Sequence, residues 1–383
     1  MTQAPSFYSH VNTRLLSLDA LRGFDMFWII SGEEIFHSLA NATGLPIFVW
    51  TSRQLQHTSW NGFTFYDMIF PLFIFIAGVS MPFSYHKYLS QASVEKRRSA
   101  KQKIYTSLIR RTIILLVLGM VVNGLLKWDG YENTRFASVL GRIALSCFFA
   151  AIIYLNNNLR KQILWFLILL LGYWAAMMFI PVPGFGAGVL TPEGNAEAYV
   201  DRLFLPGKLY RTVYDPEGLL STLPAICSAL LGVFTGQFLQ WKSEKWNMLR
   251  KGVTLFIAGI ILLLTGLLWG SWFPINKNMW TSSFVLYAGG WSLLLLGLFY
   301  FIIDVGGFRK WSMPFVWIGM NSILIYMASH GIVNFESTAS YVFGGLIEQT
   351  PSRWQPVWLW TGVALIQVAL LYFLYERKWF LKV

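Results

Sequence analysis

Long apolar segments recur along the whole chain, separated by short polar ones. Each has about 18 to 24 residues, enough for an α-helix rising 1.5 Å per residue to cross a hydrocarbon core of about 30 Å. Helices satisfy their own backbone hydrogen bonds in lipid, so the pattern predicts an all-α, polytopic integral membrane protein. We expect ten transmembrane helices, at about 17–40, 64–84, 110–127, 137–155, 162–182, 218–240, 252–271, 281–303, 314–334 and 355–375.

The composition favours the same class. Of the 383 residues, 55% are hydrophobic and 13% are charged, whereas a soluble domain carries roughly a quarter charged residues. No Pro/Ser-rich or polar linker divides the chain, so we expect a single domain over residues 1–383. The longest segment between predicted spans is an outer loop at about 183–218, and ordered loops of this length are often functional.

The positive charge predicts the orientation in the membrane. The formal net charge is +12, and with a cytoplasmic N-terminus 21 of the 30 Lys and Arg residues fall on the inner side. Both termini are therefore expected to be cytoplasmic. Anionic membrane lipids are the expected partners of this charge, and nucleic-acid binding is a poor explanation of it.

The most basic predicted cytoplasmic loop precedes the third span and carries Glu95-Lys96-Arg97-Arg98, Lys101 and Lys103. Such a loop is usually a topological anchor, and docking of a polyanionic cofactor is the alternative.

Charged residues within the spans cost free energy in lipid and usually face a partner or a cavity. Arg22 lies three residues after Asp19 and either pairs with it or meets an anionic ligand from the inner side. In the second case Arg110 and Arg111, placed at the start of the third span, would assist it.

The strongest candidate for chemistry is the polar segment His57-Thr58-Ser59-Trp60-Asn61-Gly62, with Asp67 five residues after it. An imidazole titrates near neutral pH and can accept a proton there, and a nearby carboxylate can orient it. The predicted topology places His57 on the outer side. Glu33, Glu34 and the loop at 183–218 lie on that side as well.

Histidine and cysteine positions argue against a metal. The five histidines are scattered, and Cys147 and Cys227 fall inside different predicted spans, so no metal-ligand spacing is present and no metal is expected. His330, near the outer end of the ninth span, is either a structural residue or a second site histidine.

The segment from His57 to Gly78 resembles the sequence around the active-site histidine of the heparan-α-glucosaminide N-acetyltransferase family of multi-pass membrane enzymes. Four further blocks agree in the same order: Ser17–Gly23, Tyr214–Gly218, Pro274–Trp280 and Gly319–Tyr326. Five blocks in one order are far more specific than a hydropathy match. The bacterial members most similar to this sequence look like membrane proteins of N-acetylglucosamine utilisation. That likeness implies a multi-pass protein of the bacterial inner membrane and suggests a homodimer.

The resemblance implies transfer of acetyl from cytoplasmic acetyl-CoA, across the membrane, to the amino group of a glucosamine-type sugar on the outer side. His57 matches the family's active-site histidine. It would act as general base in one ternary complex or as a transient acetyl carrier, with Asp67 beside it. The inner cations Arg22, Arg110 and Arg111 would hold the CoA phosphates.

Other residues in the matching blocks have either a functional or a structural interpretation. Asn61 and Asn321 either donate to the developing oxyanion or form hydrogen bonds between membrane helices. In the first case Asn321 would belong to the cofactor-binding residues. Lys277 and Asn278 either contact sugar hydroxyls or anchor the interface.

Outer acidic and aromatic residues have the same two kinds of interpretation. Glu217 either recognises the substrate amine or opens the sixth helix. Trp60 either stacks on a sugar or belongs to an interfacial belt. Glu33, Glu34 and His330 complete the predicted substrate-binding set.

The sequence leaves several acceptors open. At the outer end of the first span this chain has Ser31-Gly32-Glu33-Glu34, where the family enzyme has an Asn and a Gly-rich stretch. Acidic groups there favour a cationic acceptor, and a free amino sugar, a glycan or cell-wall fragment, or another amine or hydroxyl all remain open.

The alternative function is a transporter of N-acetylglucosamine or a related oligosaccharide, without acyl chemistry. Inverted repeats with paired broken helices would favour a transporter, and none is evident in the sequence. A membrane scaffold would explain the spans but not the acidic and His-bearing blocks.

Overall fold

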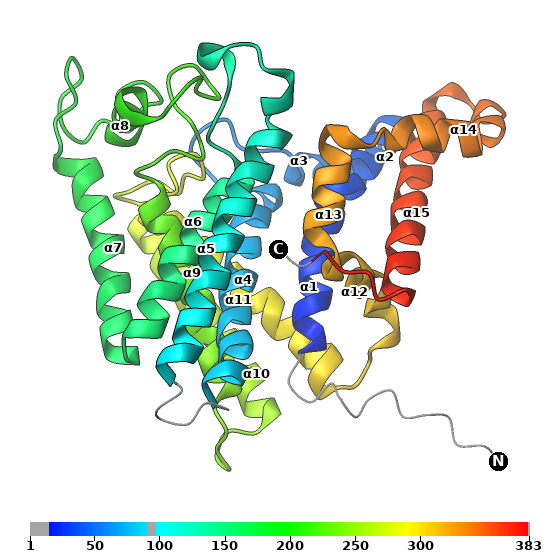
Figure 1. The fold of residues 1–383 in the computed structure, drawn as a ribbon. Helices are drawn as coiled ribbons and strands as arrows, with labels where there is room; N and C mark the ends of the chain where they lie inside the picture. The colour runs from blue at the N-terminus through cyan, green and yellow to red at the C-terminus, as the bar shows by residue number, and fades with distance from the viewer. Residues whose placement is uncertain (1–14, 91–96, 382–383) are drawn as a thin grey trace.

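The computed structural model describes residues 15–90 and 97–381, which form helices joined by loops (Figure 1). Among these residues there is no strand, and β-pairing is limited to two isolated bridges, Arg135 with Gly207 and Val182 with Gly186. The predicted all-α class is therefore confirmed. The predicted cytoplasmic ends at 1–14 and 382–383, and Glu95 and Lys96 of the basic loop, lie outside the described residues.

The helices follow one another along the chain, and the longest connections lie after α5 and on either side of α8. Their bounds are α1 Leu16–Phe27, α2 Glu33–Thr43, α3 Pro46–Gln54, α4 Phe65–Ser90, α5 Arg97–Val122, α6 Val139–Asn156, α7 Leu159–Phe179, α8 Ala196–Phe204, α9 Thr222–Gln240, α10 Met248–Gly270, α11 Ser282–Phe299, α12 Met313–Met320, α13 Ser322–Met327, α14 Phe335–Glu348 and α15 Gln355–Glu376. Wider π-helical turns follow α1, α11 and α13, at Trp28–Gly32, Tyr300–Val305 and Ala328–Ile332. Single 3-10 turns lie at Leu125–Lys127, Tyr131–Asn133, Lys310–Ser312 and Ser352–Trp354.

Within the described residues, eight helices are long and apolar enough to span a membrane. A ninth span results if the pair Lys310–Met320 and Ser322–Ile332, which is bent by 67°, counts as one. A polytopic membrane protein is therefore confirmed. The segment predicted at 17–40 forms α1, a π-helical turn and α2, and is not among these spans. The prediction of ten spans with cytoplasmic termini stays a prediction.

The third predicted span was placed too late. It was expected at 110–127, whereas α5 begins at Arg97 and the candidate span within it runs over Arg98–Val122. The first turns of α5 are rich in Lys and Arg, which interrupt the hydropathy pattern but are good helix formers. Arg110 and Arg111 therefore lie midway along α5 and are exposed, not at its start.

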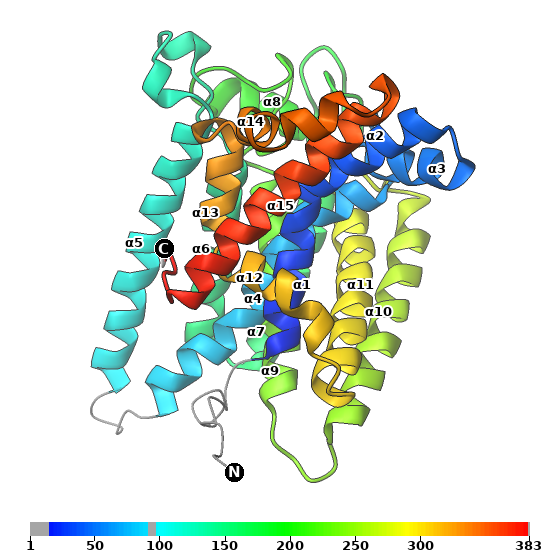
Figure 2. The same ribbon diagram turned by 90° about the vertical axis from the view of Figure 1, so that its right-hand side faces the viewer.

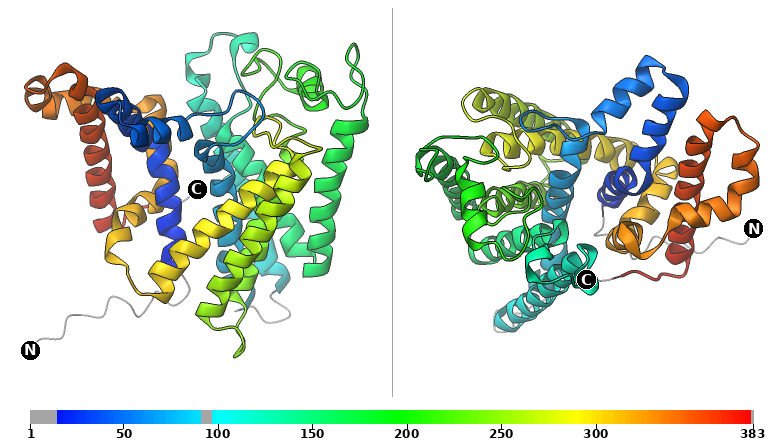
Figure 3. Two further views of the ribbon diagram at one scale, coloured as in Figure 1. Left: turned by 180° about the vertical axis from the view of Figure 1, so that it is seen from behind. Right: turned by 90° about the horizontal axis from the view of Figure 1, so that it is seen from above.

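The helices form two groups that stand side by side, α4 to α11 in one and α1, α2 and α12 to α15 in the other (Figure 1; seen from above in Figure 3). Glycines bring helices close within each group. A Cβ on Gly78 of α4 would lie 2.1 Å from the Ala229 carbonyl oxygen in α9, where Gly232 packs in return. Gly23 of α1 and Gly319 of α12 make the same kind of contact.

Connecting loops gather at one end of the bundle and position the site. The loops after α3, α5, α7 and α10 lie at this end together with α8 and α14 (Figure 1). The predicted outer loop at 183–218 belongs here, in the long connection that contains α8. Figure 2 shows α15 crossing in front of α1 and meeting α14 and α2 at the same end.

Candidate active site

The turn before α4 places His57, and the first residues of α4 build that turn. The Thr64 amide donates to Asp67 Oδ2 at 3.2 Å, so the carboxylate in the third helical position reaches back to the helix start. The Thr58 hydroxyl donates to the same oxygen at 3.1 Å. Gly62 has a φ of +124°, and a Cβ there would lie 3.3 Å from Thr58 Cγ2. The turn therefore needs a glycine at this position.

Asp67 orients His57. Its Oδ1 accepts a hydrogen bond from His57 Nδ1 at 2.8 Å; the Asp67 side chain is 1% exposed and that of His57 is 50% exposed. Because a carboxylate only accepts, Nδ1 carries the proton and Nε2 of the neutral ring keeps its lone pair. The arrangement gives an accessible base on a buried support.

Lys277 reaches His57 from the loop between α10 and α11. Its Nζ lies 3.0 Å from Nε2 and 3.1 Å from Nδ1 of His57, and 4.0 Å from Asp67 Oδ1. Burial lowers the pKa of Lys277, while the carboxylates of Asp67, Glu217 and Glu33 act to raise it. A primary amine therefore lies at the edge of the imidazole in this structure.

Hydrogen bonds hold the His57 turn against two distant loops. Asn276 Nδ2 donates to Asn61 Oδ1 at 3.0 Å, and the Gly62 amide donates to the backbone of the same loop at 2.9 Å. Trp60 Nε1 donates to the Leu190 carbonyl at 2.8 Å. An oxyanion-donor role for Asn61 and a sugar-stacking role for Trp60 were each one of two alternatives. In the structure both residues fasten this turn and are not among those lining the cavity beside it.

A cavity of about 570 Å³ opens beside His57, between the two groups of helices. Five predicted site residues line it: His57, Glu217, Lys277, Asn278 and His330. Side chains from segments far apart in the chain complete its wall, among them Tyr66 of α4, Asn123 after α5, Arg135, Tyr214 and Tyr326 of α13. Its volume is in the usual range for a small-molecule site.

Arg135 fixes the part of the cavity wall formed by the connections after α5 and after α8. It donates to Asp215 Oδ2 and Oδ1 at 2.8 and 2.5 Å, bonds Glu217 as well, and lies over the Tyr210 ring at 4.6 Å. Burial acts to lower the pKa of Arg135, but Asp215 and Glu217 outweigh it and the pKa is raised. Glu217 does not open the sixth span, since α9 begins only at Thr222. It faces the cavity as the partner of Arg135.

A buried polar cluster supports this wall from beneath α8. The Arg142 side chain is 1% exposed and donates to Ser221 Oγ at 2.5 Å, and Ser221 Oγ donates to Glu197 Oε1 at 2.8 Å. Asp201 Oδ1 accepts from the Leu219 amide at 2.8 Å. Burial raises the pKa of Asp201 to about 6, against the Leu219 hydrogen bond that lowers it, and burial raises the pKa of Glu197.

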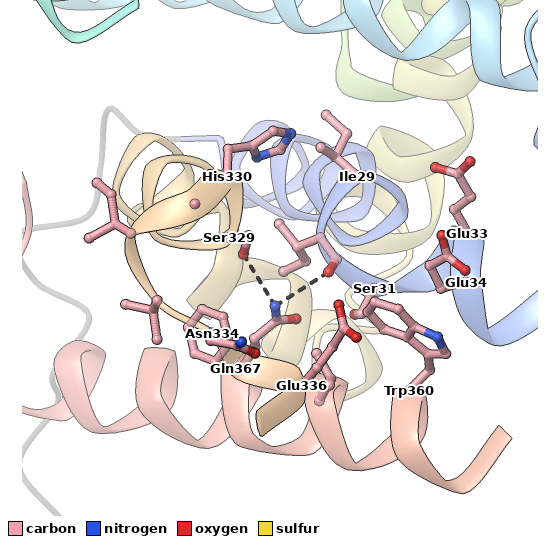
Figure 4. Close-up of a pocket in the computed structure, with 16 residues that line it drawn as sticks. Ile29, Ser31, Glu33, Glu34, Ser329, His330, Asn334, Glu336, Trp360 and Gln367 are labelled. Carbon is pink, nitrogen blue, oxygen red and sulfur yellow. Dashed lines mark hydrogen bonds between the residues drawn. The ribbon is translucent and has the colours of Figure 1, made fainter. Parts of the chain in front are cut away.

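The predicted acidic residues line a second pocket. Glu33, Glu34 and His330 border a space of about 490 Å³ together with Glu336 and Gln367. Figure 4 shows this pocket with the Gln367 amide inside it and Glu33 and Glu34 along one side. The two acidic residues line this pocket and not the His57 cavity, while His330 borders both spaces.

The predicted inner residues lie away from His57. Arg22 Nη1 is 3.4 Å from Asp19 Oδ1, so the predicted pairing is confirmed, and Nη2 donates to Ser80 Oγ at 2.9 Å. Asn321 lies at the bend between α12 and α13, where it donates to the Trp379 carbonyl at 2.9 Å. Roles of these residues toward a cofactor stay predictions. Among residues 15–90 and 97–381, no group of three His, Cys, Asp or Glu could hold a metal ion.

Comparison with known proteins places the chain in a family. The family model described as heparan-alpha-glucosaminide N-acetyltransferase, catalytic, matches residues 14–266. The chain belongs to this family. It is 29% identical to the heparan-alpha-glucosaminide N-acetyltransferase of Mus musculus, over 86% of this chain and 56% of that protein, and the Homo sapiens protein gives the same values. The chain thus spans about half the length of the curated relatives it matches.

Membership of the N-acetyltransferase family rests on a region that includes the His57 turn and the Arg135 wall. The match ends before the loop that supplies Lys277 and Asn278. The alignments with the two curated relatives cover a larger share of the chain.

Sequence reasoning missed Arg135 and the direct contact between Lys277 and His57. Asp215 and Glu217 were singled out as a block, but Arg135 lies 80 residues before Asp215 and shows no spacing that links them. Lys277 was named for sugar contacts, because nothing local relates it to a residue 220 positions away. The only feature of the sequence that could have indicated these contacts is that Arg135 and Lys277 are basic residues in outer loops that also contain several acids.

Proposed function

We propose that this protein is a transmembrane N-acetyltransferase that moves acetyl from acetyl-CoA on the cytoplasmic side to the amino group of a glucosamine-type sugar on the other side. The observation that carries the proposal is His57, oriented by Asp67 and facing a cavity between two groups of helices. Family membership supports the reaction class, since the mouse and human relatives are named as N-acetyltransferases of a glucosaminide.

The reaction needs a proton acceptor, because an ammonium group has no lone pair with which to attack. The ammonium first gives one proton to solvent. The neutral amine then attacks the thioester carbonyl carbon; a C–N bond forms and the carbonyl electrons move to oxygen. His57 Nε2 takes the proton that the nitrogen then loses. Collapse of this intermediate breaks the C–S bond, and CoA leaves as thiolate and takes up the proton from His57, giving the amide and the free thiol.

We assign Lys277 a part in this step. Its Nζ lies 3.0 Å from His57 Nε2, which is the position from which a substrate amine can hydrogen-bond to the base. The flexible four-carbon stem lets the ammonium turn toward the thioester oxygen when the substrate amine takes that position. There it would stabilise the developing oxyanion, the role that the sequence suggested for Asn61 or Asn321.

Direct transfer in one ternary complex is the simpler route for this site. A neutral primary amine is a strong enough nucleophile to attack a thioester without a covalent enzyme intermediate. Nδ1 of His57 is held by Asp67, which suits the ring to proton transfer through Nε2. The donor would approach from the opposite end of the helices, where the basic residues are expected to face the cytoplasm.

The test uses purified protein in nanodiscs with acetyl-CoA and glucosamine, following free CoA and N-acetylglucosamine. The parent should make product, and His57→Ala should lose at least about a hundredfold in rate. Glu132→Gln is the control, because Glu132 is exposed in the loop after α5 at the same end and does not line the cavity. Parent protein that binds acetyl-CoA without making product from any amine would contradict the proposal. Acetyl-histidine in a quenched reaction would favour the covalent route.

One observation favours a second candidate function, a sugar transporter. The ninth span is bent by 67° where α12 meets α13, and broken helices are common in transporters. Within the described residues it is the one bent pair, whereas inverted repeats would supply two. Sugar uptake by proteoliposomes without acetyl-CoA would select the transporter.

A further inference from the structure

We propose that the pocket bordered by Glu33, Glu34 and Glu336 binds the ammonium group of a second sugar unit, so that the acceptor is a cationic, unsulfated amino-sugar oligomer. This inference rests on the proposed function, because it names the substrate class of the same reaction. It concerns a space of about 490 Å³ that lies beside the His57 cavity and is separate from it.

The carboxylates of this pocket outnumber its cations, although Glu33 also has a partner outside the lining, His37, whose Nε2 lies 3.4 Å from Glu33 Oε1. Glu33 and Glu34 come from the start of α2 and Glu336 from the start of α14, so two helices bring three carboxylates to one space. Among the described residues that line it, none is Lys or Arg, and His330 is the single basic side chain. Such a pocket attracts a cation and disfavours an anion.

Buried polar atoms point to a ligand independently of the acids. Gln367 is 1% exposed, and its Nε2 donates to the Ile30 carbonyl at 3.3 Å and to Ser329 Oγ at 3.2 Å. No described residue donates to its Oε1, nor does Ser31 Oγ, 2% exposed, have a partner there. Both residues line the pocket (Figure 4), and most buried polar atoms in proteins have a hydrogen-bond partner, so a ligand that carries donors would complete this pair. Sugar hydroxyls and an ammonium group are such donors.

The position of the pocket relates it to the reaction. Ile29 and His330 line both spaces, so the two share a wall. An oligomer whose reacting amine lies at His57 can extend past this wall and place its next unit among the acids. Trp360 on the far side offers an aromatic face to a sugar ring. Both volumes lie within the range of small-molecule sites.

The same charges argue against a sulfated acceptor. A sulfate group on the second unit would meet three carboxylates where an ammonium group would be neutralised. The substrate class therefore differs from the one in the name of the mouse and human relatives, in which the glucosaminide is that of heparan. We expect an unsulfated glucosamine oligomer.

The experiment compares three acceptors, glucosamine, its β-1,4-linked dimer and the same dimer with a 6-sulfate on its second unit, on the parent, Glu336→Gln and Glu348→Gln. Glu348 is an exposed acid at the other end of α14, so its variant carries the same charge change outside the pocket. The parent should use the dimer with a KM about tenfold below that of the monomer. Glu336→Gln should remove this advantage and leave monomer turnover unchanged, and Glu348→Gln should resemble the parent.

A binding measurement separates this inference from the proposed function. Calorimetric titration of the dimer into His57→Ala protein, alone and combined with Glu336→Gln, reports the pocket without turnover. If no acetyl transfer occurs but Glu336→Gln weakens dimer binding about tenfold, the transferase proposal fails and the pocket assignment holds. If the monomer and dimer behave alike, or if the sulfated sugar is preferred, the assignment is overturned whether or not acetyl is transferred.

Discussion

At the level of single residues, Asp67 serves both local structure and the candidate chemistry. One carboxylate oxygen accepts from Thr58 and Thr64 and closes the turn before α4, and the other holds His57 Nδ1. A substitution that keeps the shape but changes the hydrogen bonding can therefore test the second role alone.

Asp67→Asn should lower kcat by about a hundredfold. An amide nitrogen in place of Oδ1 would donate to Nδ1, so the proton would move to Nε2 and the ring could no longer accept one on the cavity side. Steady-state kinetics with acetyl-CoA and glucosamine measures the effect, and circular dichroism confirms the helical fold. A folded variant whose kcat is close to the parent value would show that His57 is not oriented through Asp67.

Lys277 should give the reaction an alkaline limb. Because burial lowers its pKa, the ammonium form should be lost as the pH rises through a value below the ordinary Lys range near 10.4. If the ammonium stabilises the oxyanion, kcat should fall over that pH interval, and Lys277→Gln should lower kcat about a hundredfold and abolish the limb. Measuring kcat against pH for the parent and for Lys277→Gln tests whether the limb belongs to Lys277. An unchanged limb in the variant would assign the titration to another group.

At the level of elements, the α8 segment should respond to pH through Asp201. Its side chain is fully buried, and burial raises the pKa from an ordinary 3.8 to about 6. A raised pKa means that the folded state binds the proton more tightly, so this stabilisation is complete below about pH 4 and disappears as the pH rises through about 6.

The free energy of unfolding should therefore fall by about 2 kcal/mol between pH 4 and pH 7 on account of this group, at about 1.4 kcal/mol per pKa unit. Asp201→Asn, which stays neutral, should show a smaller loss over the same interval. Thermal unfolding at several pH values compares the two proteins. Parallel pH profiles of Tm would contradict the assignment.

The contact between α4 and α9 should depend on Gly78. A Cβ at this position would lie 2.1 Å from the Ala229 carbonyl oxygen, which is backbone and cannot move without shifting a helix. Gly78→Ala should cost about 1–3 kcal/mol of stability. Gly172→Ala in α7 is the control, because no atom lies within 4 Å of the Cβ added there. Equal Tm values for the two variants would show that close packing at Gly78 is not needed.

At the level of the whole molecule, the proposed function requires His57 and the basic residues to face opposite sides of the membrane. Glu132 lies in the loop after α5, at the His57 end, and Glu244 lies in the loop after α9, at the other end; both are exposed. Cys147 and Cys227 are buried and can be replaced to give a background for labelling.

In intact cells, Glu132→Cys should react with a membrane-impermeant maleimide and Glu244→Cys should react only after permeabilisation. The positive-inside distribution of Lys and Arg is the reason for this orientation. Labelling followed by gel shift gives the result. The reverse pattern would place His57 on the cytoplasmic side and remove the need for acetyl to cross the membrane.

Much of this protein follows from short stretches of its chain. In lipid each helix must satisfy its own backbone, so a window of apolar residues is enough to place most spans. The errors occur where charge interrupts that window, as at the start of α5. His57 and Asp67 could be paired from sequence because ten residues and one turn separate them.

Contacts between distant segments come from packing that no local window contains. Lys277 meets His57, and Arg135 meets Asp215, because glycine contacts and loop hydrogen bonds set how the helices are rotated and where their loops meet. The same packing divides the predicted site, with Glu33 and Glu34 in one pocket and His57 in the next. Hydropathy depends on the side chains within each helix, whereas the site depends on which helix faces lie together.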